Sequence, residues 1–568
     1  MINQLGRSTN ISYKNSTSPL NDKNKDKTSF KGGKFIGFIQ TCEKKPMMNV
    51  ALIDLITAII PRTILDCFRN IFAGLETFRR EASGLVVNCL IPGFITLGYA
   101  KLFNNKIMGG KDKANLSSCW ASSDTLNKVV EHYDNVAESP SYKEGLQIFG
   151  GNEKHARVYS VNHQLLSEAS GLDGFEHKNF KDILSKNEMS KHAKEMTVAM
   201  FEEKNGVLTE TLTKGTPKNK INKIFEEITS KTHIAQDVKF GANSKTAFTA
   251  NLESTLVDSH QVLKGIMKEN IAPGATKDYL LRAKKLLKTK SVLGMLTILP
   301  LALSMQYINR KITECSSGVK GAPIHEGYAQ DGIKQKTSEE VAKEKKGLVG
   351  KKILAVSSML GLALLSMMKL PNMKTLKDIV QFKDKFPTMN QARAISAGTF
   401  ASRMAVADDN AELNEHWTRD TVTFASMYFL GDYGAKGVAT LMEKSKGVEL
   451  LNKNYKPEDN KGVLKKIKNW VFNTHLKSSD ELKGAGEELK FAKKLRANAQ
   501  LANIGTSLLL LGLIVPVYTM FKTKQADKKE QLKRQQALQN NNMVVLNKLE
   551  QPNPFEAINS RKIRTVAK

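Results

Sequence analysis

"SLLLLGLIVPVYTMFKTK", residues 507–524, is an apolar run with a proline at its centre and lysines at its C-terminal end. "NCLIPGFITLG" at residues 88–98 and "LTILPLALSMQ" at residues 296–306 share the arrangement. Proline deletes a backbone donor and costs about 3 kcal/mol inside a helix. Membrane helices accommodate it because neighbouring helices, hydroxyl groups and water satisfy the freed carbonyl. The prolines Pro92, Pro300 and Pro516 therefore predict kinked spans.

Uncharged apolar segments are the main signal for the fold. They cover residues 82–100, 291–309, 353–368 and 497–521. A helix that crosses a bilayer needs about 20 apolar residues, so the third segment is short unless its flanking lysines reach the headgroups. The competing interpretation is a set of core helices in a large soluble protein. We predict an α-helical, multi-pass membrane protein with about four spans, three of them with a central proline.

A one-sided arrangement competes with these spans, because a proline at mid-depth can mark a hairpin that enters and leaves on the same side. The hairpin would expose unpaired backbone to hydrocarbon, which favours the spans. Lysine and arginine are similarly frequent on both predicted sides, so the positive-inside rule does not orient the chain. The spans would place residues 101–290 and 369–496 on one side, and both termini with residues 310–352 on the other.

The chain is predicted to divide at these segments. The expected parts are a disordered polar leader (1–45), an amphipathic helix with the first span (46–110), a helical extramembrane region (111–290), the second span (291–309), a charged linker (310–352), the third span (353–368), a second helical extramembrane region (369–496), the fourth span (497–521) and a basic helix with a flexible tail (522–568).

A positive net charge accompanies the apolar segments. The chain has 86 Lys and Arg against 56 Asp and Glu, a net charge of +30. The surplus is spread along the chain rather than gathered in one module, which makes nucleic acid an improbable partner, and basic residues flank the apolar segments, which is typical of contact with anionic headgroups. The predicted headgroup contacts are Arg79, Arg80, Lys284, Lys285, Lys288, Lys351, Lys352, Lys522 and Lys524.

The stretch from Arg62 to Arg80 has helical amphipathic periodicity. Its apolar positions, which recur every three or four residues, are Ile64, Leu65, Phe68, Ile71, Phe72 and Leu75. Phenylalanine and arginine just before a span indicate a helix lying in the membrane interface. The alternative is that the apolar stripe packs against a protein core.

Catalytic motifs are not evident in the sequence. Nucleophile elbows, HExxH, Walker loops and dinucleotide fingerprints are missing, and the five cysteines form no CxxC pair. We therefore expect no catalytic residue, cofactor, resident metal or small-molecule substrate. Asp408, Glu412 and His416 are a weak metal or acid–base candidate on one helix. A face held together by i,i+4 pairs is the simpler explanation.

These observations favour a non-enzymatic integral membrane protein that acts as a scaffold or interaction protein. Its partners would be the lipid bilayer, other membrane proteins or further copies of itself, in the inner membrane if the source is bacterial. A transporter or channel-like protein with proline-broken helices is the second hypothesis, and it predicts ionisable or strongly polar residues within the spans. A secreted effector that inserts into membranes is the third. A membrane enzyme using the Asp408–Glu412–His416 cluster is the fourth.

Overall fold

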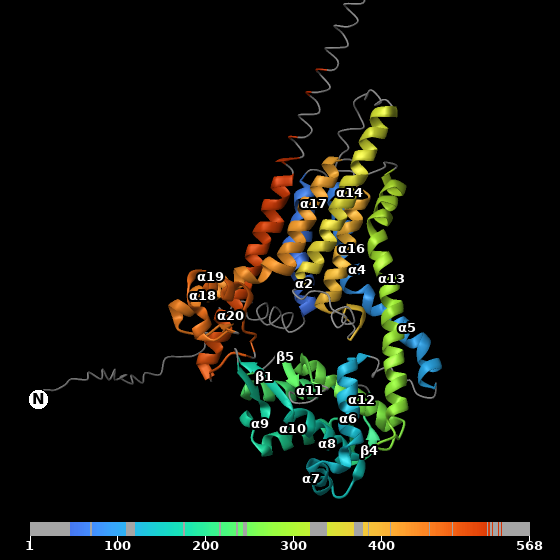
Figure 1. The fold of residues 1–568 in the computed structure, drawn as a ribbon, viewed down its shortest axis with the longest axis vertical. Helices are drawn as coiled ribbons and strands as arrows, with labels where there is room; N and C mark the ends of the chain where they lie inside the picture. The colour runs from blue at the N-terminus through green and yellow to red at the C-terminus, as the bar shows by residue number, and fades with distance from the viewer. Residues whose placement is uncertain are drawn as a thin grey trace, which may run out of the picture.

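The computed structural model describes residues 46–68, 71–109, 120–317, 338–367, 379–519, 521–522, 525, 532 and 536, with short gaps at 174–175, 215–216, 234–236, 242–246, 384–385, 409, 454, 480 and 485. The predicted leader 1–45, Lys524 and most of the predicted tail lie outside the described residues. The chain is mostly helical and has three parts: a helical bundle, a lower unit beneath it and a side unit (Figure 1).

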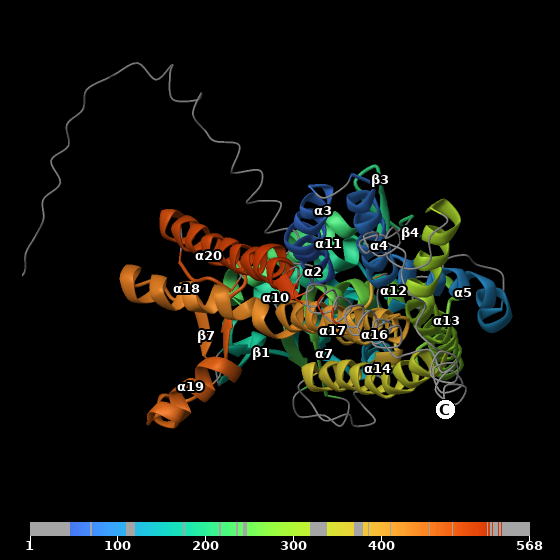
Figure 2. The same ribbon diagram turned by 90° about the horizontal axis from the view of Figure 1, so that it is seen from above.

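The helical bundle is built from segments that lie far apart in the sequence. Its members are α2 (Pro46–Asp54), η1 (Leu55–Ile59), α3 (Ile60–Cys67), α4 (Ile71–Cys89), α13 (Lys277–Ser317), α14 (Ser338–Ser366), α16 (Met389–Ala405), α17 (Asn410–Ala425), η6 (Ser426–Leu430) and η8 (Leu508–Ile514). Seen from above, α16 and α17 lie between α14 on one side and α2, α3 and α4 on the other (Figure 2).

Three helices are long and apolar enough to cross a membrane: Lys277–Cys315, Gly347–Ser366 and Gly486–Thr519. A fourth candidate is a bent pair, Gly74–Cys89 followed by Ile91–Met108, whose axes differ by 41°. These helices contain the four uncharged segments, apart from the ends of two of them. The described ends of the predicted linker 310–352 are helical, because they extend α13 and begin α14.

Residues 62–80 do not form the single amphipathic helix expected from their periodicity. The chain leaves the helix at Phe68, and α3 and α4 pack against each other as a hairpin. Gly74 allows this close approach, since a Cβ there would overlap Sγ of Cys67. Two helices with a break between them can keep the same apolar periodicity as one long helix, so the pattern alone did not reveal the break.

The helices α16 and α17 lie in a different part of the protein from the one predicted. They belong to the region 369–496 that was predicted to lie outside the membrane, yet α16 packs against both α13 and α14, and α14 also contacts α17. The buried face of α16 is rich in small residues, which lets neighbouring helices approach closely. The bundle therefore contains more helices than the uncharged segments alone indicated.

The three prolines singled out above have different surroundings. Pro92 stands at the start of α5 (Ile91–Met108), directly after the 41° bend, while Pro300 lies within the continuous helix α13. Pro516 follows η8, a π-helical stretch in which the backbone N–H of Val515 bonds to Leu510 O. η1 precedes Pro61 in the same way, and the two π-helical stretches pack together. A wider turn relieves the clash between a proline ring and the preceding turn.

The lower unit, residues 120–276, is mixed rather than purely helical. Its elements are α6 (Ser123–Asp134), η4 (Val136–Glu138), α7 (Pro140–Ile148), α8 (Glu153–Ser167), β1 (Ala169–Asp173), β2 (Glu176–Asn179), α9 (Phe180–Ile183), α10 (Lys186–Val198), β3 (Phe201–Lys204), β4 (Val207–Leu212), α11 (Lys218–Thr232), β5 (Asp237–Phe240), β6 (Phe248–Asn251) and α12 (Leu252–Lys268). The strands form an antiparallel sheet in the order β2-β1-β5-β6 and a separate β3-β4 hairpin. The first part of α13 completes one of its two cores and then rises into the bundle (Figure 1).

The side unit, residues 431–495, comprises α18 (Gly431–Lys446), β7 (Leu451–Lys453), η7 (Pro457–Asn460), α19 (Val463–Phe472), β8 (Thr474–Leu476) and the first part of α20 (Gly486–Ser507). α18 packs along α20, which continues into η8 and so into the bundle. Both the lower unit and the side unit lie at the same end of the bundle, its lower end in Figure 1.

Candidate functional site

A buried ionic network occupies the interior of the bundle. Its central members come from four helices: Arg62 on α3, Glu81 on α4, Arg403 on α16, and His416, Arg419 and Asp420 on α17. All six are buried, and Asp420 has no exposed surface. Charged residues of this kind are seldom buried unless they are paired.

Arg403 connects the two sides of the network. Its guanidinium donates to Glu81 Oε2 at 2.8 Å and to Asp420 Oδ1 at 3.1 Å. Arg62 donates to Thr423 Oγ1 at 2.8 Å and lies 3.6 Å from Glu81 Oε1. Glu81 therefore joins two arginines from helices that are far apart in the sequence.

A second group of contacts extends the network to the upper end of the bundle. Arg419 donates to His416 Nδ1 at 2.9 Å, and because that nitrogen accepts, the neutral His416 donates through Nε2 to Glu412 Oε1 at 3.1 Å. Arg310 of α13 then bridges Glu412 and the exposed Asp408, at 2.6 Å from the latter. The backbone N–H of Asp408 also donates to Glu412, at 2.7 Å.

The depth of the network follows from the register of α17 against α14. Lys351 donates to Asn410 and Trp417 donates to Ser358, and both pairs are separated by 59 residues. The same offset of 59 residues places Asp420 of α17 level with Gly361 of α14. Gly361 lies at the midpoint of the uncharged run 353–368. Glu412 is level with the beginning of that run, about 12 Å higher at 1.5 Å per residue. The ionic groups thus extend from one end of an apolar helix to its middle.

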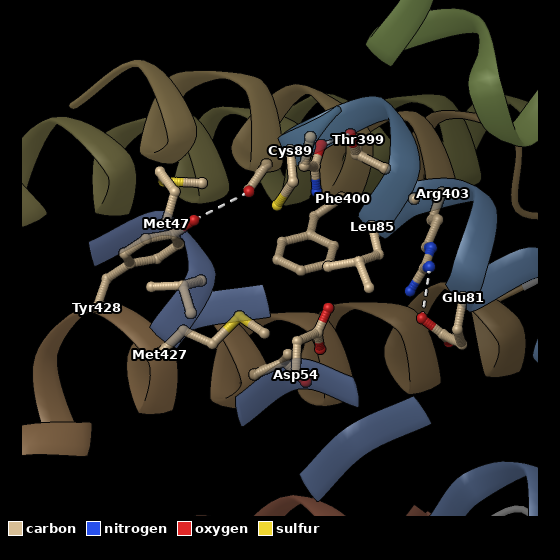
Figure 3. A pocket seen from close by; sticks show the side chains of 15 residues that line it. Met47, Asp54, Glu81, Leu85, Cys89, Thr399, Phe400, Arg403, Met427 and Tyr428 are labelled. Atoms are coloured by element: carbon tan, nitrogen blue, oxygen red, sulfur yellow. Dashed lines mark hydrogen bonds and ion pairs between the residues drawn. The ribbon is translucent and has the colours of Figure 1, made fainter. Parts of the chain in front are cut away.

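A small cavity continues from the network toward the lower end of the bundle (Figure 3). The Glu81–Arg403 pair and Asp54 line one part of it, and Met47 and Tyr428 line another. The space has room for about one water molecule. Tyr428 forms a 3.0 Å hydrogen bond with Ser396 at this wall. Polar groups therefore follow one another through most of the bundle.

The structure brings together the predicted cluster Asp408, Glu412 and His416, but as part of this network. Their ligand atoms already contact Arg310 and Arg419, so the cluster is one of ion pairs and hydrogen bonds. Among the described residues, a metal-like group of ligands occurs elsewhere, at His192, Glu195 and Glu227 of the lower unit. Lys191 lies 2.9 Å from Glu227 and 3.7 Å from Glu195, so one ammonium group already pairs with both carboxylates.

The predicted headgroup contacts fall into two groups. Lys285, Lys288, Lys351 and Lys522 are exposed, and Lys284 and Lys352 are partly buried. Arg79 donates to Thr313 at 2.6 Å and keeps part of its side chain exposed. Arg80 differs from the prediction, because it is buried inside the bundle and faces protein rather than solvent.

Glu81 and Arg403 were not among the predicted site residues, and Asp420 was noted only as a neighbour of the Asp408–Glu412–His416 cluster. Glu81 and Arg403 are 322 residues apart, and no local pattern connects them. Comparison with models of known families, with curated proteins and with solved structures gave no match to this chain.

Proposed function

We propose that the protein is a multi-pass integral membrane protein whose helical bundle moves a small charged solute across the membrane. The observation that carries this proposal is the Glu81–Arg403–Asp420 group at mid-depth of the apolar helix α14. Ionisable groups inside a membrane are costly, face the bundle interior and mark ion or solute pathways. The sequence alone had favoured a scaffold because the uncharged segments contain no such groups.

The proposed membrane topology has more than four spans. Besides the three apolar helices and α4, the segments α2–α3, α16 and α17 run the length of the same bundle. The added passes bring residue 46 to the same side as the lower and side units, whereas four spans had placed it on the opposite side. The upper ends of α13, α14 and α17 would lie on the other side of the membrane.

Solute flux tests the proposal directly. The full-length protein is reconstituted into vesicles, and the movement of protons, chloride and phosphate is followed separately. We expect flux of at least one of these above that of empty vesicles, and an Asp420→Asn variant should lose most of it. The matched control is Asp459→Asn in the exposed η7 of the side unit, which should behave as the wild type. Equal flux in protein-containing and empty vesicles for all three solutes would contradict the proposal.

A scaffold role remains the second candidate, and α19 is the observation that favours it. This helix exposes Val463, Leu464, Ile467 and Phe472 beside three lysines. An amphipathic helix with exposed apolar residues and lysines is suited to the surface of an anionic membrane. In that case the side unit would rest on the bilayer, and the protein would carry no flux.

A further inference from the structure

Arg80 lies on the side of α4 that faces α16. Arg80, Gly84 and Asn88 are spaced by four residues and therefore share one face of the helix. A Cβ placed on Gly84 would be 3.9 Å from Arg403 Nη2, and Asn88 accepts a 2.9 Å hydrogen bond from Thr399. Arg80 follows on this face, one turn nearer the upper end of the bundle.

The guanidinium of Arg80 lacks a partner within the part of the chain that the structure describes. It forms no hydrogen bond and no ion pair there, although the residue is only 5% exposed and its Nε is fully buried. The other three central arginines, Arg62, Arg403 and Arg419, each lie within ion-pair distance of a carboxylate. Arg80 is therefore the exception in the network.

The two central carboxylates of the network, Glu81 and Asp420, are already engaged by other arginines. Glu81 contacts Arg62 and Arg403, and Asp420 contacts Arg403 and Arg419. Glu415 lies 3.9 Å from Arg419, Glu76 accepts from Thr313, and Asp54 lines the cavity below. Arg80 is within electrostatic range of Arg419 and Arg403, which have the same charge, and of Glu81 and Glu76, but it forms an ion pair with neither carboxylate.

A buried guanidinium without a counter-charge costs several kcal/mol, and an anion bound there removes that cost. We propose that Arg80, with Arg403 and Arg419 nearby, forms a binding site for a small oxyanion of the phosphate class. The guanidinium fork matches two oxygens of such an anion, whereas a lysine would offer a point charge. This inference rests on the proposed function, for which it names the solute class: an anion that enters the network at its upper half.

Binding of inorganic phosphate to the full-length protein in lipid-free detergent tests the site at constant ionic strength. Phosphate should raise the melting temperature of the wild type, and equilibrium dialysis should show saturable binding. Arg80→Gln should weaken binding by about ten- to a hundredfold, the loss expected for charge-assisted hydrogen bonds. Arg79→Gln is the matched control, since Arg79 bonds Thr313 outside the site, and it should bind as the wild type does.

A second variant guards against a folding defect in Arg80→Gln. Arg80→Met should fold in phosphate-free buffer and melt no lower than the wild type, because it removes an uncompensated charge, and phosphate should leave its melting temperature unchanged. The proposal would be overturned if phosphate did not stabilise the wild type. It would also be overturned if phosphate stabilised the wild type and both Arg80 variants equally.

Two further comparisons identify the source of the anion and test the binding site independently of the proposed transport. Vesicles with and without phosphatidylglycerol, in the absence of phosphate, show whether a lipid headgroup fills the site in an Arg80-dependent manner. Either occupant supports the site. Arg80-dependent binding without flux would refute transport and keep the site. Phosphate flux that Arg80→Gln leaves unchanged would keep transport and refute the site.

Discussion

Replacing Asp420 by asparagine should destabilise the bundle by about 3–5 kcal/mol, the usual cost of removing one partner from a buried ion pair. Asp420 has no exposed surface, and its Oδ1 lies 3.1 Å from Arg403 Nη1 and 3.3 Å from Arg419 Nε. Asparagine keeps the shape of the side chain but removes the charge. Arg403 retains Glu81 alone, and Arg419 retains only the more distant Glu415.

Asp408 provides a control of the same chemistry at the edge of the network. Its side chain is 68% exposed and lies 2.6 Å from Arg310. An exposed ion pair contributes about 0–1 kcal/mol, so Asp408→Asn should cost no more than that. The two variants make the same chemical change at different depths. The difference between their free energies of unfolding therefore measures the effect of burial.

The assay is reversible unfolding in mixed detergent micelles, followed by fluorescence. The three tryptophans lie in different parts of the protein: Trp120 in the lower unit, Trp417 in the bundle and Trp470 in the side unit. In a variant that keeps Trp417 as its only tryptophan, the fluorescence therefore reports the unfolding of the bundle. A cost below about 1 kcal/mol for Asp420→Asn, or equal costs for both variants, would refute the argument from burial.

Three further predictions concern the other parts. Gly265→Ala should destabilise the lower unit by about 1–3 kcal/mol in a melt followed by Trp120, because its Cβ would overlap the hydroxyl of the buried Tyr279; Gly350→Ala, which meets open space, should be neutral or slightly stabilising. Burial lowers the pKa of His260 to about 4, so the unfolded lower unit binds a proton that the folded one does not between pH 6.5 and 4. Its stability should fall by up to about 1.4 kcal/mol per pH unit as the pH drops through that range, and His260→Phe should flatten the slope. Brominated lipids should quench Trp470 if α19 rests on the bilayer, and undiminished fluorescence would contradict that contact.

The apolar helices could be predicted because long uncharged runs have few alternatives. Residues 291–309 and 497–521 lie largely within two of the three candidate spans, and 353–368 supplies most of the third. The strands of the lower unit could not be predicted, since each has at most six residues and too few alternating positions to stand out from turns. The register of the α3–α4 hairpin depends on a close contact at Gly74 that only the folded chain reveals.

The ionic network could not be predicted, for a different reason. A charged residue in a helical sequence indicates a solvated face unless its partner is known, and Arg403 meets partners on α4 and α17 that are distant in sequence. One signal was available in α16, where small residues fill the stretch between Arg393 and Arg403. Such a helix suits the interior of a bundle better than a solvated surface.

The most direct test of a membrane-spanning bundle is the location of its two ends relative to the membrane. On a cysteine-free background, Cys315 is restored near the exposed upper end of α13, and single cysteines are introduced in turn at Glu153 in the lower unit and at Lys465 in the side unit. The protein is inserted into sealed vesicles and treated with a thiol reagent that cannot cross membranes. We expect Cys315 to react from one side and the cysteines at positions 153 and 465 to react from the other. Labelling of all three from the same side would contradict a membrane-spanning bundle.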